Sequence, residues 1–154
     1  MHLPTPLRQQ VESALGHRIT ASVAASGGCI NNGARLDTRD GDSFFLKWNE
    51  VAPPEMFEAE ADGLEALRRA CTVRIPAPLD RGGGAGTPSW LLLEYVGSGT
   101  PAADYPERLG TSLAELHASE LGPSFGWARD NWIGSLPQAN EERSNWGAFW
   151  RDLR

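Results

Sequence analysis

Ser43-Phe44-Phe45-Leu46-Lys47-Trp48 is an apolar run with one lysine near its end. As a β-strand it alternates with a period of two, so Leu46 and Trp48 point to one face of a sheet and Phe45 to the other. Lys47 shares the face of Phe45. Moving an ammonium group out of water costs more free energy than the neighbouring methylenes return. The run therefore predicts a strand whose lysine meets a carboxylate or a phosphate.

Segments on both sides of this strand bear on the partner of Lys47. Residues 26–32 form an upstream turn of small residues, and residues 56–60 form a downstream helical segment that carries glutamates. A glycine turn, a strand lysine and a helix glutamate, in this order, are the parts with which protein kinases hold nucleotide phosphates. The combination predicts a nucleotide-phosphate site.

Glu60 is the carboxylate that we expect to orient Lys47. It shares a helix with Phe57 and Leu64, which occupy inward positions three and four residues away, whereas Glu58 should face solvent. The alternative is that both glutamates are ordinary charges on an exposed helix. An exposed lysine–glutamate pair would then contribute only about 0–1 kcal/mol to stability.

The turn and its cysteine each have two interpretations. The Gly27-Gly28 pair either permits positive φ in a hairpin or lets backbone N–H groups form a nest for phosphate oxygens. Cys29 is either a small buried apolar residue or, beside such a positive nest, a reactive thiol with a lowered pKa. The residues alone leave both alternatives open.

Composition excludes several classes of function. The 14 basic and 20 acidic residues give a net charge of −6, and without a basic stripe we expect no nucleic-acid partner. The apolar runs are far shorter than the ~20 residues that cross a bilayer, and the N-terminus does not resemble a secretory signal. We therefore expect a cytoplasmic protein without a membrane partner. The two cysteines and three histidines lack metal-ligand spacing, so no metal site is predicted in this chain.

Periodicity and turn residues predict an N-terminal lobe over residues 1–97, with about five antiparallel strands. The predicted elements are a helix at 6–15, strands at 18–25, 34–38 and 43–48, a helix at 53–70, and strands near 79–80 and at 90–96. Asp40-Gly41 is a two-residue hairpin signal. The glycine-rich stretch 82–88 is predicted to be a loop, and residues 97–101 a hinge-like linker.

Residues 98–154 are predicted to contain the hinge and the beginning of a helical C-terminal lobe. Helices are expected at 105–119 and 146–153, and Asp130-Asn131 is expected to start a turn. Four of the six tryptophans lie beyond residue 126. So many large aromatic side chains need a partner surface that this segment cannot supply by itself. We therefore expect the lobe to be truncated.

Several segments, in matching order, resemble the fructosamine (ketosamine-3) kinase family. These segments are Gly27-Gly28-Cys29-Ile30-Asn31, Phe45-Leu46-Lys47-Trp48-Asn49, residues 56–64, Leu92-Leu93-Glu94-Tyr95, Leu113-Ala114-Glu115-Leu116-His117 and residues 125–138, with Asn140 and Trp146. The specific part is the Asp-Asn-x-Ile-Gly-x-x-Pro-Gln motif within 130–138. The lysine–glutamate pair is shared with all protein-kinase-like folds, including aminoglycoside and choline kinases.

The resemblance implies an α+β, protein-kinase-like fold that uses ATP and Mg²⁺ to phosphorylate the 3-hydroxyl of fructosamines on glycated amines or proteins, which leads to deglycation. In this analogy Lys47 contacts the nucleotide phosphates and Glu60 fixes Lys47. The cofactor-binding residues that we expect are Gly27, Gly28, Cys29, Asn31, Lys47, Glu60, Glu94 and Val96. The resemblance also suggests a redox-dependent homodimer through a Cys29 disulfide.

Glu94 and Val96 are expected to offer backbone groups to the adenine edge. The residues alone fit a buried strand that leaves the sheet equally well.

The sequence departs from the family pattern in one major respect. Family members carry a His-Gly-Asp catalytic loop with a following Asn and a metal-binding Asp, and no His-Gly-Asp triplet occurs here. We therefore predict that no catalytic residue is present, that the Mg²⁺ ligands are absent too, and that these residues alone do not turn over. The alternatives are another small-molecule phosphotransferase, of aminoglycoside or choline kinase type, and a non-catalytic nucleotide-binding fragment. Residues 125–138 argue against the first.

Overall fold

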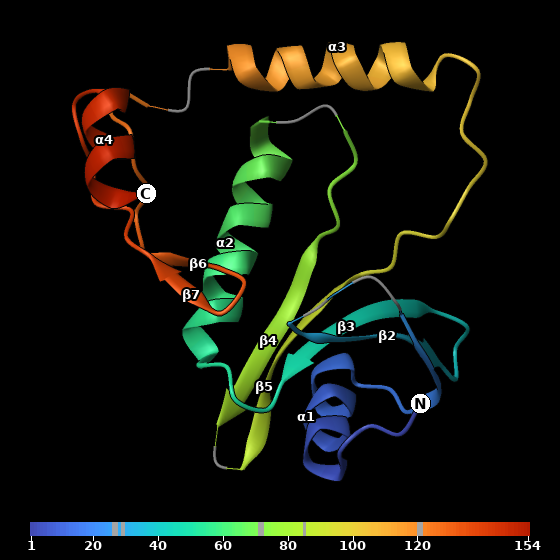
Figure 1. Cartoon of the computed structure of the whole chain (residues 1–154). Coiled ribbons are helices and arrows are strands. Elements are labelled where there is room, and N and C mark those ends of the chain that lie inside the picture. Colours follow the sequence, from blue (N-terminus) through green and yellow to red (C-terminus); the bar gives the residue numbers. More distant parts are fainter. Residues whose placement is uncertain (26–27, 29, 71–72, 85, 120–121) are drawn as a thin grey trace.

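The computed structural model describes residues 1–25, 28, 30–70, 73–84, 86–119 and 122–154. Within these residues an antiparallel sheet of five strands has the order β1-β2-β3-β5-β4 (Figure 1). Its strands are β1 (Ile19–Ala24), β2 (Asn32–Thr38), β3 (Ser43–Asn49), β4 (Pro78–Gly84) and β5 (Thr87–Glu94). Helix α1 (Thr5–Leu15) covers one face of the sheet and helix α2 (Pro54–Ala70) the other. The α+β fold predicted from the sequence is confirmed.

The alternation predicted for β3 separates two hydrophobic cores. Leu46 and Trp48 are buried against α1, in a cluster that Phe44 joins at its edge. Phe45 packs on the opposite side, in the cluster formed by α2 and β5. That second cluster is centred on the buried residues Phe57, Ala61, Leu91 and Leu93. Lys47 lies in the middle strand on the α2 side, as the period of two requires.

The β2–β3 hairpin differs in detail from the prediction of a two-residue turn at Asp40-Gly41. The Thr38 amide donates to the Asp42 carbonyl at 2.9 Å, and the Gly41 amide donates to the Thr38 carbonyl at 3.2 Å. The loop therefore has one more residue than predicted. Gly41 has a φ of 92°, the left-handed conformation that closes a three-residue hairpin with a glycine bulge.

The glycine-rich stretch predicted to be a loop contributes to two strands instead. β4 continues to Gly84 and β5 begins at Thr87. A Cβ atom on Gly82 would lie 2.9 Å from the indole of Trp90, so only glycine lets this ring lie against the strand. Trp90 in turn donates from Nε1 to the side-chain oxygen of Gln10 in α1 at 2.9 Å. Packing of one tryptophan thus overrides the low strand propensity of glycine.

The segment after β5 is mostly exposed. β5 ends at Glu94, earlier than the predicted 90–96 strand, and Val96 is exposed. Helix α3 (Tyr105–Ala118) follows without a buried residue. Among the described residues, no helix is both long and apolar enough to cross a bilayer. The division into lobes at residue 97 stays a prediction.

A small hairpin and a helix follow α3. Strands β6 (Asn131–Ile133) and β7 (Leu136–Gln138) pair antiparallel beside α2 (Figure 1). The predicted turn at Asp130-Asn131 is therefore wrong for Asn131, which begins β6. Helix α4 (Trp146–Leu153) matches its predicted bounds, and the Asn145 side chain caps it by accepting from the Ala148 amide at 2.8 Å.

Candidate functional site

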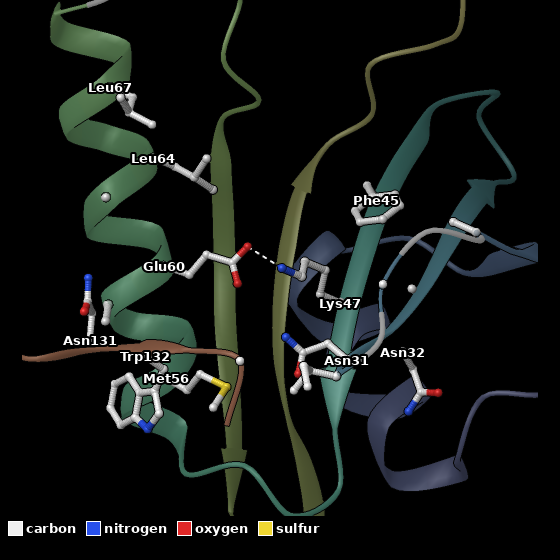
Figure 2. Close-up of a pocket in the computed structure, with 17 residues that line it drawn as sticks. Asn31, Asn32, Phe45, Lys47, Met56, Glu60, Leu64, Leu67, Asn131 and Trp132 are labelled. Carbon is white, nitrogen blue, oxygen red and sulfur yellow. Dashed lines mark hydrogen bonds and ion pairs between the residues drawn. The ribbon is translucent and has the colours of Figure 1, made fainter. Parts of the chain in front are cut away.

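Lys47 and Glu60 meet across the space between β3 and α2. The Lys47 Nζ donates to the Glu60 Oε1 at 2.5 Å, and their side chains are 25% and 29% exposed (Figure 2). Glu58 points elsewhere on α2 and pairs with Arg129. The pair is thus neither fully buried nor freely solvated, and the contact fixes the position of the ammonium.

This ion pair lies in the wall of a cavity of about 790 Å³. Such a volume falls within the range of about 300–1,000 Å³ that small-molecule sites occupy. The wall is formed by residues next to the glycine turn, by β2, β3 and α2, and by the β6–β7 hairpin. The lining residues are Ala25, Gly28, Ile30, Asn31, Asn32, Gly33, Phe45, Lys47, Met56, Ala59, Glu60, Gly63, Leu64, Leu67, Asn131, Trp132 and Gly134. The cavity is therefore mostly apolar, with a few polar groups beside the ammonium.

Asn49, at the end of β3, holds the described end of the turn. Its side-chain amide donates to the Ile30 carbonyl at 3.1 Å and to the Asn31 side-chain oxygen at 3.0 Å. Its own side-chain oxygen accepts from the amides of Val51 and Ala52. The Asn49 side chain is buried, and all four of these hydrogen bonds are part-buried. One side chain thus fixes the turn relative to the strand that carries Lys47.

The predicted site residues fall into three groups. Four of them line the cavity together: Gly28, Asn31, Lys47 and Glu60. Glu94 and Val96 are not among its lining residues and lie at and beyond the end of β5. Gly27 and Cys29 lie outside the described residues, so the redox role of Cys29 stays a prediction.

Comparison with known proteins decides the family of this chain. A family model described as fructosamine kinase matches residues 5–154. The chain belongs to the fructosamine kinase family. The resemblance found in the sequence is thereby confirmed over almost the whole chain.

This member of the fructosamine kinase family is similar to known relatives in sequence and in fold. It is 39% identical to "Probable ketoamine kinase slr1563" of Synechocystis, over 96% of this chain and 50% of that protein. It is also 39% identical to the chloroplastic protein-ribulosamine 3-kinase of Arabidopsis thaliana, over 89% and 42%. The crystal structure of a candidate fructosamine-3-kinase from Haemophilus somnus shares the fold, with a TM-score of 0.82 at 24% identity, over 96% and 50%. The chain spans about half the length of these relatives.

Several residues of the site carry no pattern in the sequence that predicts a role for them. Asn131 and Trp132 line the cavity from β6, and Asn49 holds the turn. Residues 125–138 show a resemblance to the family but no pattern that predicts a contact with α2. The available signal for Asn49 was its place as a polar residue directly after the predicted strand at 43–48. No local pattern places β6 against α2.

Glu94 belongs to an ion network at the end of β5. Its carboxylate pairs with Arg74 and accepts from the Ala77 amide, and Arg68 lies 4.0 Å away. The hydrogen bond from Arg74, followed by that from Ala77, lowers the pKa of Glu94. The Glu94 amide also donates to the Ala77 carbonyl at 2.8 Å, so this backbone donor is already used.

The lowered pKa of Glu94 predicts an acid-sensitive contribution to stability. A carboxyl whose pKa is lower in the folded state stabilises the fold above its ordinary pKa of about 4.3, and this stabilisation is lost as the pH falls further. We expect Arg74→Ala to destabilise the chain at pH 6 and the difference from wild type to shrink towards pH 3. Urea denaturation at both pH values measures the difference in unfolding free energy. Arg39→Ala, which removes another exposed arginine, is the control. A constant difference between wild type and Arg74→Ala would contradict this assignment.

Proposed function

We propose that this chain is the ATP-binding part of a ketoamine 3-kinase. The observation that carries the proposal is the 2.5 Å contact between Lys47 and Glu60 in the wall of the cavity. A lysine ammonium has three N–H donors, and Glu60 takes one of them. The others are available to phosphate oxygens, so Glu60 supplies position and Lys47 supplies positive charge for the phosphates.

Two further features of the cavity suit a nucleotide. A Cβ on Gly28 would lie 3.3 Å from the Asn31 carbonyl oxygen, so a larger residue would crowd the turn that faces the phosphates. The side chains of Phe45, Leu64 and Leu67 provide an apolar wall. ATP, when bound, supplies the phosphoryl group for transfer. Because the Glu94 amide already donates to the Ala77 carbonyl, the proposed contacts with adenine are limited to the Glu94 carbonyl and the backbone of Val96.

In this proposal, the residues that catalyse transfer of the phosphoryl group are ones that this sequence does not contain. It has no His-Gly-Asp triplet, and its described residues contain no group of three or more His, Cys, Asp or Glu side chains arranged to hold a metal ion. The chain alone is proposed to bind ATP without transferring its phosphate.

The acceptor follows from the named relatives, which include protein-ribulosamine 3-kinases and a mouse ketosamine-3-kinase. We propose that the whole protein phosphorylates the 3-hydroxyl of a ketosamine on a glycated amine or protein, and so promotes deglycation. The cytoplasmic location and the Cys29 homodimer stay predictions.

The experiment uses the fact that Lys47 is the single lysine of the chain. Calorimetric titration with ATP and MgCl₂ is expected to show saturable binding. ATP at ten times its Kd should slow acetylation of Lys47 by acetic anhydride about 10-fold, as measured by mass spectrometry. The N-terminal amine provides the internal control. Absence of both binding and protection would contradict the proposal, and robust phosphorylation of a fructosamine would contradict the predicted inactivity.

A further inference from the structure

Arg129, just before β6, contacts two residues of helix α2. One precedes Glu60 in the sequence and the other follows it. Its Nη1 lies 3.2 Å from the Glu58 Oε2, and its Nε lies 2.9 Å from the Asp62 Oδ2. Glu58 and Asp62 are four residues apart and therefore share a face of the helix, with Glu60 between them in the sequence. One guanidinium thus connects two adjacent turns of α2, because its planar fork presents donors in several directions.

The loop that carries Arg129 is held by contacts of its own. The Asn140 side-chain amide donates to the Arg129 carbonyl at 3.1 Å, and the Asn140 backbone amide donates to the Asp130 carboxylate at 2.8 Å. Asn140 is only 3% exposed, and its carbonyl accepts from the Trp127 amide at 2.9 Å. Arg129 is therefore presented to α2 from a braced position rather than from a free loop.

The same hairpin lies beside the other half of the site. Asn131 and Trp132 line the cavity next to α2, as Figure 2 shows. At its tip, a Cβ built on Gly134 would lie 3.7 Å from the Ile30 side chain, next to the glycine turn. The hairpin therefore spans the distance between the helix that carries Glu60 and Ile30, at the described end of the glycine turn.

The strength of these contacts limits what they do. The side chains of Arg129, Glu58 and Asp62 are 40%, 43% and 41% exposed. Ion pairs this exposed contribute little to global stability, because water solvates the separated charges well. Shifting α2 within the folded chain takes less free energy than unfolding the chain, so weak contacts can bias the position of the helix. Arg129 is therefore better placed to set the helix than to hold the fold together.

We propose that Arg129 is a positioning residue: by bridging Glu58 and Asp62 it holds α2 where Glu60 reaches Lys47. Its effect on nucleotide binding rests on the proposed function, whereas its effect on the ion pair does not. Arg129 and its two partners are not among the residues that line the cavity, so its influence on the site passes through the position of Glu60.

The test is a double-mutant cycle between Arg129→Ala and Glu60→Gln. In the wild-type background, Arg129→Ala is expected to weaken ATP binding about 3- to 10-fold and to speed Lys47 acetylation by a similar factor, because the released amine is more accessible. In the Glu60→Gln background it should change neither quantity further. Arg129→Lys should keep part of the wild-type ATP affinity and part of the protection of Lys47, since a lysine pairs with one carboxylate at a time.

A matched control is Arg151→Ala, which removes another exposed arginine whose partner, Asp152, lies on the same helix α4. It should leave both measurements unchanged. Equal effects of Arg129→Ala in both backgrounds would show a general structural role and overturn the proposal, as would no effect in either. If the wild-type chain does not bind ATP, the proposed function fails, and acetylation of Lys47 without nucleotide still decides the role of Arg129.

Discussion

Lys47→Ala is expected to weaken ATP binding by about 10- to 100-fold. A hydrogen bond to a charged group contributes about 1.5–3 kcal/mol, and each 1.4 kcal/mol corresponds to a tenfold change in Kd. The substitution removes the positive charge on this wall of the cavity and leaves Glu60 as an unpaired negative charge there. Calorimetric titration with ATP and MgCl₂ measures the change. The effect should be largest for ATP and smaller for adenosine, which has no phosphates.

The controls separate loss of a phosphate ligand from loss of structure. Glu60 is 29% exposed, so water can solvate its unpaired carboxylate and the thermal midpoint should change little. Glu60→Gln keeps the shape of the pair and should weaken binding less than Lys47→Ala. Arg39→Ala, which removes an exposed positive charge from the β2–β3 hairpin of the same sheet, should have no effect. An ATP affinity of Lys47→Ala equal to that of wild type would remove Lys47 from the proposed site.

The part of the fold that follows from local chemistry was predictable. The alternation around Lys47 determines which side chains of β3 enter each core, and Pro54 begins α2 because its missing N–H is not needed in a first helical turn. The prediction that the glycines of β4 form a loop was wrong, because the reason for their presence lies outside the local sequence. Gly82 makes room for Trp90 of the next strand, a contact that residue propensity does not contain.

The candidate site was predictable where it depends on one strand and the helix that follows it. Spacing on α2 selects Glu60 over Glu58, and the structure pairs Glu60 with Lys47. The contact of the segment before β6 with α2 was not predictable, because Arg129 and Glu58 are 71 positions apart in the sequence. A short mixed segment such as 129–134 has no periodicity that reveals a partner. Tertiary contacts of this kind have to be observed.

Phe57→Ala is expected to cost about 3–5 kcal/mol of unfolding free energy. Phe57 is 1% exposed and joins α2 to Leu91 and Leu93 in the second core. Truncation removes the transfer free energy of the ring and leaves a cavity that a five-stranded sheet closes only in part. Since domains are stable by about 5–15 kcal/mol, this loss brings the chain close to unfolding.

Urea denaturation followed by tryptophan fluorescence measures the loss, and Val51→Ala is the matched control. Val51 is 91% exposed, so its truncation should change the unfolding free energy by no more than about 0.5 kcal/mol. Phe57→Leu keeps most of the buried apolar surface and should lose less than alanine does. A loss below about 1 kcal/mol for Phe57→Ala would show that α2 is not anchored through this core. Glu60 would then owe its position to contacts such as those of Arg129, and the ATP affinity of Phe57→Ala would stay close to that of wild type.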